Sequence, residues 1–189
     1  RPRGRHPNAA PHSRRQAADQ AGVSIVAGDT KVVPRGKADR IFINTSGIGV
    51  LRHSLQIGGA NARVGDKILI NGTLGDHGIA VMAKREGLEL ETDILSDCAA
   101  LNGLGADLLE EGDSIRVLRD PTRGGVATTL KEIALQSDVS ITLDESALPL
   151  KSAVRGVCAV LGLDPLYVAN EGKVLVFVSP DAADRTLAR

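Results

Sequence analysis

Apolar positions recur along this chain with two spacings, and each spacing predicts a different kind of element. Short apolar runs bounded by turn residues, such as KVLVFV at 173–178, are typical of strands buried on both faces. Longer runs with apolar residues three or four positions apart, such as VATTLKEIALQS at 126–137, are typical of helices. The predicted strands are 23–28, 40–50, 68–72, 114–120, 139–145, 165–170 and 173–180, and the predicted helices are 14–22, 79–87, 100–112, 126–137 and 152–162.

The order of these elements predicts a sheet covered by helices. Strands and helices mix beyond residue 67, and strands that are apolar on both faces need helices on both sides. The expected fold class is therefore α/β in the broad sense (α+β mixed), with helices packed on a mixed β-sheet. The last two strands are expected to close a hairpin, with Glu171 in its bend.

Shifts in composition suggest where the chain divides. Residues 1–12 are rich in arginine and proline and contain no acidic residue, so we expect a disordered or foreign leader rather than a nucleic-acid-binding arm. The polar stretch 51–66 carries turn residues and is expected to be a linker. Residues 67–189 are expected to form one compact α/β domain, truncated at its end.

Composition narrows the classes of function. Hydrophobic residues make up 42% of the chain, but two Phe, one Tyr and no Trp offer few platforms on which nucleobases could stack. A formal net charge of zero supplies no field to attract DNA or an anionic membrane, and no apolar run approaches the roughly 20 residues of a membrane helix. Cys98 and Cys158 are isolated from each other and from zinc-type spacings. We expect a soluble cytoplasmic protein that binds neither nucleic acid nor membrane.

Two loops before predicted elements carry polar residues suited to a nucleotide. In AGDTKVV, Gly28 lets the backbone bend, Asp29 could hold magnesium and Lys31 projects from the next strand. The alternative for this loop is a turn capped by Asp29, with a solvated Lys31. In GTLGDHG, Asp76 is expected to cap the following helix, and His77 lies where helix N–H groups point outwards. The alternative for His77 is an ordinary surface histidine.

A third loop, RDPTRGG, precedes the predicted helix at 126–137. Gly124 and Gly125 would let backbone N–H groups approach an anion at the helix start, and Arg123 could add a bidentate grip. The same residues could equally form a plain turn. In a fourth segment, ANEGK, the ordinary interpretation of Glu171 is a solvated glutamate in a hairpin.

Taken together, these segments resemble the HypE family, the carbamoyl dehydratases of nickel–iron hydrogenase maturation. The resemblance runs from about Ser13 to the end of the chain. The wider superfamily, which includes aminoimidazole ribonucleotide synthetase, selenophosphate synthetase and thiamine-monophosphate kinase, shares an ATP-using two-domain plan. The segments that carry the resemblance are VSIVAGDTKVV, IFINTSGIGV, GDHGIAVMAKREGLEL, SDCAALNGL, RDPTRGGVATTLKEIA and VANEGKV.

The resemblance implies a reaction and its participants. HypF places a carbamoyl group on a C-terminal cysteine of HypE, which then uses ATP and Mg²⁺ to dehydrate that group to a thiocyanate. The cyanide passes to iron on a HypC–HypD complex, and the family commonly forms homodimers. The resemblance makes Glu171 the general base and Lys31 an electrostatic orienter. It assigns nucleotide or phosphate contacts to Asp29 (also the metal contact), Thr30, His77, Asp120, Thr122, Arg123, Gly124 and Gly125.

The sequence departs from the family pattern at both ends. Residues 13–50 resemble only the last part of the family's N-terminal ATP-binding domain, and the family's terminal cysteine motif is not present before Arg189. We therefore expect a fragment that does not complete the reaction by itself. Two alternatives stay open: a non-catalytic remnant that binds a partner, and another ATP-dependent member of the superfamily such as a selenophosphate synthetase.

Overall fold

The structure is a computed structural model, and it consists of two units. It describes residues 9–37, 42–87 and 94–189. Contacts within the chain group residues 1–54 into the first unit and residues 55–189 into the second. No helix in the described ranges is both long enough and apolar enough to cross a membrane.

In residues 9–37 and 42–54, the described part of the first unit, one helix forms and there is little other regular structure. Helix α1 (Ala9–Gln20) confirms the predicted helix near the start of the chain. The predicted strands at 23–28 and 40–50 are wrong for the described residues, since neither 23–28 nor 42–50 forms a strand; residues 40 and 41 lie outside the described part. A strand satisfies its backbone groups only by pairing with another strand. Apolar side chains such as Val26 and Ile48 are accordingly exposed.

The second unit is built on a three-stranded antiparallel sheet. Its strands are β1 (Lys67–Ile70), β2 (Ile115–Arg119) and β3 (Leu175–Val178), in the order β1-β3-β2. Phe177 of β3 lies opposite a residue of β1 on one side and of β2 on the other. The expected class, helices packed on a sheet, is confirmed. The sheet was expected to be mixed, and both pairings in the described residues are antiparallel.

The predicted strand at 165–170, and with it the predicted hairpin, is wrong. Pro165–Tyr167 form a short 3-10 helix, η3, so that no strand precedes β3 across the Glu171 bend. Two local features favour the turn. The ring of Pro165 fixes φ and removes a ladder donor, and the Asp164 side chain accepts the N–H of Leu166 at 2.9 Å.

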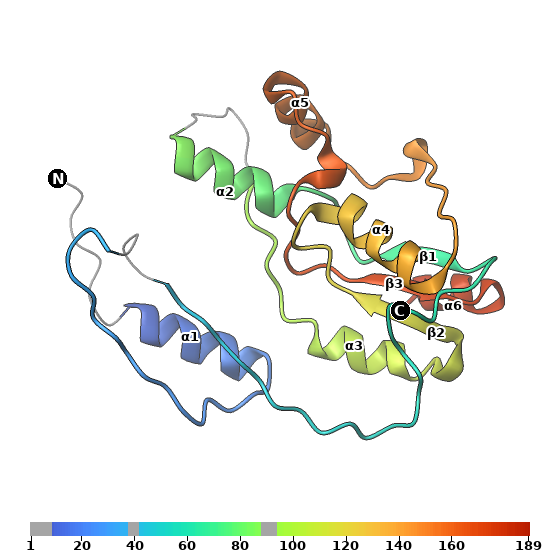
Figure 1. Cartoon of the computed structure of the whole chain (residues 1–189), viewed down its shortest axis with the longest axis horizontal. Helices are drawn as coiled ribbons and strands as arrows, with labels where there is room; N and C mark the ends of the chain where they lie inside the picture. The colour runs from blue at the N-terminus through green and yellow to red at the C-terminus, as the bar shows by residue number, and fades with distance from the viewer. Residues whose placement is uncertain (1–8, 38–41, 88–93) are drawn as a thin grey trace. The chain divides into compact units, whose positions relative to one another are not determined.

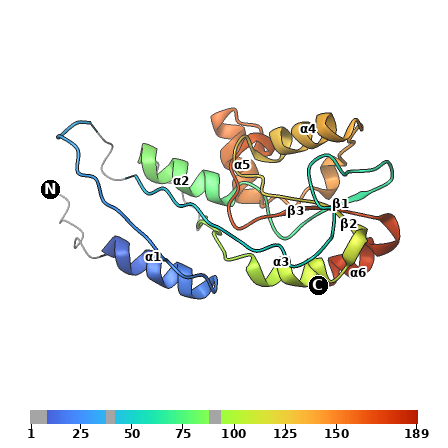
Figure 2. The ribbon, with the colours of Figure 1, turned by 60° about the horizontal axis from the view of Figure 1, so that its bottom comes forward.

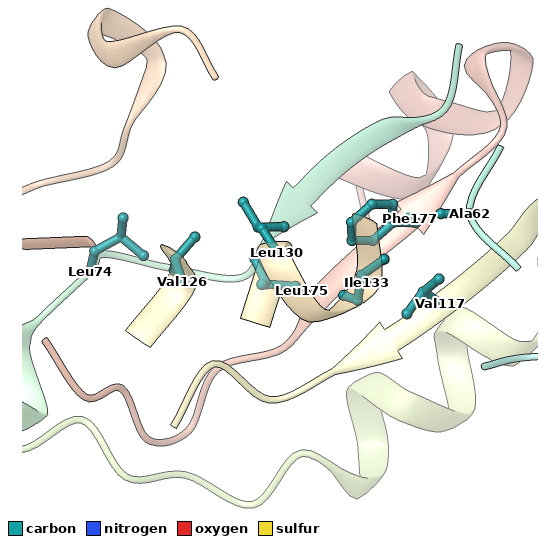
Figure 3. Packing of buried hydrophobic residues seen from close by; sticks show 8 residues of the cluster. All are labelled: Ala62, Leu74, Val117, Val126, Leu130, Ile133, Leu175 and Phe177. Atoms are coloured by element: carbon teal, nitrogen blue, oxygen red, sulfur yellow. The ribbon is translucent and has the colours of Figure 1, made fainter. Parts of the chain in front are cut away.

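Helices cover both faces of the sheet. In Figures 1 and 2, α4 (Gly125–Ser137) lies on one side of the strands, and α3 (Asn102–Leu109) lies on the other. The short α6 (Ala183–Leu187) shares the α3 side, where its first residue joins the core formed with β3. The core between the sheet and α4 is shown in Figure 3 and consists of Ala62, Leu74, Val117, Val126, Leu130, Ile133, Leu175 and Phe177.

Alternation along β3 explains why its whole run is apolar. Leu175 and Phe177 face the α4 core, whereas Val176 and Val178 face the core formed with α3 and α6. All four side chains are buried, as expected for a central strand covered on both sides.

Two further helices pack against each other beside the sheet. They are α2 (Asp76–Glu86) and α5 (Ser152–Leu161), and their shared core contains Ile79, Val154 and Cys158. The predicted helices at 79–87, 100–112, 126–137 and 152–162 are thus confirmed. The remaining short 3-10 helices are η1 (Gly112–Ser114), η2 (Glu145–Ala147) and η4 (Pro180–Ala182).

The predicted strand at 139–145 is also wrong, since residues 139–144 pair with no strand and η2 follows directly. Asp144 favours that turn because its side chain accepts the backbone N–H of Ser146 at 2.9 Å. Residues 55–66 belong to the second unit. The N–H of Gly58 donates to the carbonyl of Arg116 at 3.0 Å, and Ala62 is buried in the α4 core.

Candidate functional site

A single buried asparagine joins the three loops of the second unit that the sequence singles out. Asn170 is 2% exposed. Its Oδ1 accepts the N–H of Gly75 at 2.8 Å, which binds the 72–78 loop. Its Nδ2 donates to the carbonyl of Pro121 at 3.2 Å, in the RDPTRGG loop, and to that of Val168 at 2.9 Å. The 169–173 segment, which carries Glu171, is therefore fixed to the other two loops.

The start of α2 differs from the expected capping arrangement. Gly75, with φ 80°, takes the cap position, and Asp76 is the first helical residue. The Asp76 carboxylate is fully buried, where it accepts from Thr73 Oγ1 at 2.5 Å and lies 2.6 Å from Lys151 Nζ. The hydrogen bond to Asp76 raises the pKa of Lys151 above its ordinary value. The predicted N-cap role of Asp76 is wrong because its carboxylate turns inward to this lysine.

The start of α4 requires both of its glycines. Gly124 and Gly125 have φ of 70° and 66°, a region that other residues rarely adopt. A Cβ on Gly125 would lie 2.3 Å from the carbonyl oxygen of Leu166, so η3 can approach only because the side chain is absent. The first N–H groups of α4 have no partner within the helix. Gly124 is exposed, whereas Gly125 is buried against η3, so the close packing lies one residue after the exposed end of the loop.

The charged residues of the RDPTRGG loop differ in their partners. Asp120 is paired with Arg119 at 2.8 Å, and Arg119 also reaches Glu132 at 3.3 Å. Arg123 is exposed, and within the described residues no ion pair is recorded for it. Thr122 beside it is half-buried. Arg123 is thus the cation of this loop that is free to meet an anion.

Glu171 lies on a turn that is held from two sides. Gly172, with φ 61°, packs so closely on residues 97–99 that a Cβ would lie 2.3 Å from the carbonyl oxygen of Asp97. Lys173 is 7% exposed and forms an ion pair with Asp97. On the other side, Asn71 donates to the carbonyl of Gly172 at 3.1 Å. Glu171 is half-buried, and no hydrogen bond or ion pair of its side chain is recorded in the described parts of the chain.

His77 contacts a segment that the sequence did not mark as functional. Its Nδ1 lies 2.9 Å from Ser96 Oγ and 3.5 Å from Cys98 Sγ. Asn170, Lys173 and residues 96–98 are the parts of this site that sequence reasoning missed. Two sequence signals could have found them. Asn170 and Lys173 lie inside the ANEGK segment, and residues 96–98 form the SDC triplet, but these two segments were used only for the family resemblance.

The remaining candidates belong to the first unit. Asp29 and Lys31 are exposed, and Asp29 Oδ1 accepts the N–H of Thr30 at 2.8 Å. Their joint action with Glu171 stays a prediction. Within the described residues no three His, Cys, Asp or Glu side chains are grouped as a metal site. Magnesium at Asp29 would therefore take most of its oxygen ligands from a bound phosphate or water.

Residues 63–189 match the family described as AIR synthase related protein, C-terminal domain. The chain belongs to this family. Within the family it is similar to the carbamoyl dehydratase HypE of Rhizobium leguminosarum bv. viciae, with 56% identity over 173 residues. The match covers 91% of this chain and 49% of that relative. The chain thus spans about half the length of the curated relatives it matches, and the resemblance to HypE is confirmed over that half.

Solved HypE structures share the fold. A chain of a HypE–HypF complex superposes with a TM-score of 0.91 at 54% identity, covering 94% of this chain and 58% of that one. A HypE in complex with ATP gives a TM-score of 0.80 at 45% identity, covering 92% of this chain and 52% of that one. The AIR synthase-related fold expected from the sequence is therefore found, and one solved relative binds ATP.

Proposed function

We propose that this chain contributes the Glu171 and RDPTRGG loops to the ATP-dependent dehydration of an S-carbamoyl cysteine. The product is a thiocyanate, the source of the cyanide ligands of nickel–iron hydrogenases. The observation that carries the proposal is the set of hydrogen bonds made by the Asn170 side chain, because they fix the Glu171 turn beside the loop that carries Arg123 and the start of α4. Neither Glu171 nor Arg123 has an ion pair recorded among the described residues. The similarity to HypE and the ATP-bound relative support the proposal.

The chemistry needs a base and an anion site close together. The oxygen of a carbamoyl group leaves only after it carries a phosphoryl group, and its nitrogen must lose protons to become a nitrile. Glu171 takes the proton from nitrogen, since its carboxylate has no competing partner recorded in the described residues. Arg123 and the first N–H groups of α4 hold the phosphorylated oxygen until it departs. Gly124 is exposed in front of those N–H groups, Gly125 adds its own backbone N–H, and Thr122 adds a hydroxyl donor.

In this proposal the first unit contributes the charged side chains of Asp29 and Lys31 to the reaction. The exposed Asp29 carboxylate is the type of ligand that Mg²⁺ prefers when a nucleotide supplies the other oxygens. When bound, Mg²⁺ neutralises charge on the transferred phosphoryl group. Lys31 orients the carbamoyl group, and Thr30 donates to phosphate. In the second unit His77 and Asp120 border the nucleotide.

The same proposal names partners and a compartment. HypF binds the chain and supplies the carbamoyl group; the solved HypE–HypF complex of a relative supports the binding. A HypC–HypD complex receives the cyanide, and a second copy of the chain forms a homodimer. Two free cysteines fit a reducing compartment, so we assign the reaction to the cytoplasm.

The test uses a chimera in which residues 13–189 replace the matching half of the Rhizobium leguminosarum relative. Purified chimera is incubated with HypF, carbamoyl phosphate and ATP, and carbamoylation and cyanation are followed by intact-protein mass spectrometry. Glu171→Gln keeps size but cannot take a proton at neutral pH, so cyanation should slow by about 10² to 10⁴. Lys31→Met should also slow it, because a stabilising charge is lost. Carbamoylation should be unchanged in both.

A matched control is Glu145→Gln, which removes an exposed carboxylate that lies 3.9 Å from Arg155 on the surface. It should leave both steps unchanged. A Glu171→Gln chimera that cyanates at the unsubstituted rate would remove Glu171 from the mechanism. A chimera that is carbamoylated but never cyanated, with Glu171 intact, would favour the non-catalytic alternative for this half of the protein.

A further inference from the structure

A compact cluster of one thiol, one imidazole and one hydroxyl lies next to the proposed site and has no role in the proposed reaction as a group. Cys98 Sγ lies 3.5 Å from His77 Nδ1 and receives a hydrogen bond from Ser96 Oγ at 3.2 Å. Ser96 Oγ in turn lies 2.9 Å from His77 Nδ1. The three polar atoms form a closed triangle at the start of α2.

This triangle has the composition of an activated nucleophile. A thiol attacks only as the thiolate, so a base within reach of the proton is the main requirement. When His77 Nδ1 carries no proton, it can accept the proton of the Cys98 thiol across 3.5 Å. Once the proton has moved, the imidazolium N–H and the Ser96 hydroxyl both face the sulfur anion. His77 therefore serves as base and then as stabilising cation.

The segment that carries the thiol is firmly held. Residues 97–99 pack on Gly172, and Asp97 pairs with the buried Lys173. The titratable and charged groups around this segment are His77 from α2, Asp97 beside Cys98 in sequence, and Lys173 from the Glu171 turn. Cys98 itself is exposed, so a small molecule can reach it.

The second cysteine provides an internal contrast. Cys158 is buried in the α2–α5 core at 1% exposure. Burial raises the pKa of its thiol above the ordinary value. Because its sulfur is buried, a small molecule cannot reach it while the chain is folded, so it should be inert.

We propose that Cys98 is a reactive thiol site that takes small-molecule disulfides and forms a mixed disulfide with them. His77 accepts the Cys98 proton, and the thiolate attacks one sulfur of the small disulfide. The new S–S bond forms as the old one breaks, and the departing thiolate takes the proton back from His77. One disulfide and one thiol enter, and one disulfide and one thiol leave. The site shares His77 with the proposed nucleotide border, but the thiol reaction does not require the proposed dehydration.

The test uses the whole chain carrying Cys158→Ser, so that Cys98 is its sole thiol. It is treated with glutathione disulfide at pH 7, and the mixed disulfide is quantified by intact-protein mass spectrometry. The same chain in concentrated urea gives the intrinsic rate of an unassisted thiol. We expect the folded chain to react at least about tenfold faster than the unfolded one.

Two further variants separate activation from exposure. His77→Gln keeps a polar side chain but removes the base, and should slow the reaction by about 10², the low end of what a positioned base contributes. Ser96→Ala should slow it less, because one donor is lost while the base remains. Circular dichroism confirms that each variant is folded. The Cys98→Ser chain, which retains Cys158, should gain no glutathione while folded.

Three results would overturn the proposal. The first is a folded chain that reacts no faster than the same chain in urea, a comparison that needs neither the His77 nor the Ser96 variant to fold. The second is a folded His77→Gln chain that reacts at the unsubstituted rate. The third is a Cys98→Ser chain that is modified as rapidly as the Cys158→Ser chain, which would place the reactive thiol at Cys158.

Discussion

Replacing Asn170 with alanine should destabilise the second unit far more than an average substitution. The change removes three hydrogen bonds, to Gly75, Pro121 and Val168, all of which are buried. A buried donor or acceptor that loses its partner costs about 1–3 kcal/mol. Because one donor and two carbonyls are affected, and water entering the space left behind can satisfy part of them, we expect a loss of about 3–5 kcal/mol.

Asn71 is the matched control, because it is also an asparagine with side-chain bonds to backbone near the Glu171 turn. Its side chain donates to Gly172 at 3.1 Å and accepts from Val174 at 2.9 Å, but the residue is exposed. Water can replace both partners, so Asn71→Ala should cost only about 1 kcal/mol. The contrast between the two variants isolates burial from the number of hydrogen bonds.

The measurement is urea unfolding followed by far-ultraviolet circular dichroism. With a slope of about 1–3 kcal/mol per molar urea, a loss of about 3–5 kcal/mol lowers the midpoint by more than about 1 M at unchanged slope. Asn71→Ala should move it by well under half of that. If the two variants shift the midpoint equally, or if Asn170→Ala stays within about 0.5 kcal/mol of the unsubstituted chain, Asn170 is not the residue that holds the loops together.

Further outcomes follow from two other places in the second unit. Gly125→Ala should destabilise the fold by about 2 kcal/mol or more, because it combines a positive φ with a Cβ that overlaps a backbone oxygen. Gly156→Ala, in open space within α5, should instead stabilise the fold by about 0.5–1 kcal/mol. The two variants are compared by their urea midpoints, and equal effects would contradict the packing argument. The hydrogen bond from Arg185, aided by Arg189, holds the pKa of Glu111 below its ordinary value of 4.5. The interaction of Glu111 with these two arginines therefore stabilises the fold above about pH 4.5, and its contribution is lost as pH falls through the lowered pKa. Glu111→Gln should therefore lower the midpoint at pH 7 but have little effect at pH 3, and a difference that is the same at both values would contradict the linkage.

Helices α2, α3, α4 and α5 and the three strands of the second unit could be predicted because each has a local signal, whereas the short α6 was not predicted. Gly87, for example, ends α2 in the left-handed conformation expected of a glycine after a helix. The order of the strands could not be predicted, since β3 lies between two strands that are distant in sequence. Strands were predicted wrongly at 139–145 and 165–170 because apolar content alone was used. Asp144 and Asp164, which cap the two short 3-10 helices, were the overlooked turn signals.

The site was predictable in its parts and not in its assembly. Arg123 stood out because a cation beside two glycines at a helix start suggests an anion site, whereas Glu171 was singled out only by the family resemblance. Asn170 did not, because a lone asparagine after an apolar run looks like an ordinary turn residue. Its importance comes from contacts that span 95 residues to Gly75 and 49 residues to Pro121, a separation that no local pattern encodes.

The paired glycines at the start of α4 are compatible both with a plain turn and with an anion site. The face of Gly125 that a side chain would occupy is filled by the backbone of η3, which is a packing requirement. The N–H groups of the first turn of α4 have no partner within the helix, which is what an anion needs. The charges of the loop favour the anion site. Asp120 is neutralised by Arg119, whereas no ion pair is recorded for the exposed Arg123 in the described residues, so the loop presents a net cation to the helix start. The function proposed above gives that asymmetry a use, because Arg123 would then grip a phosphorylated intermediate.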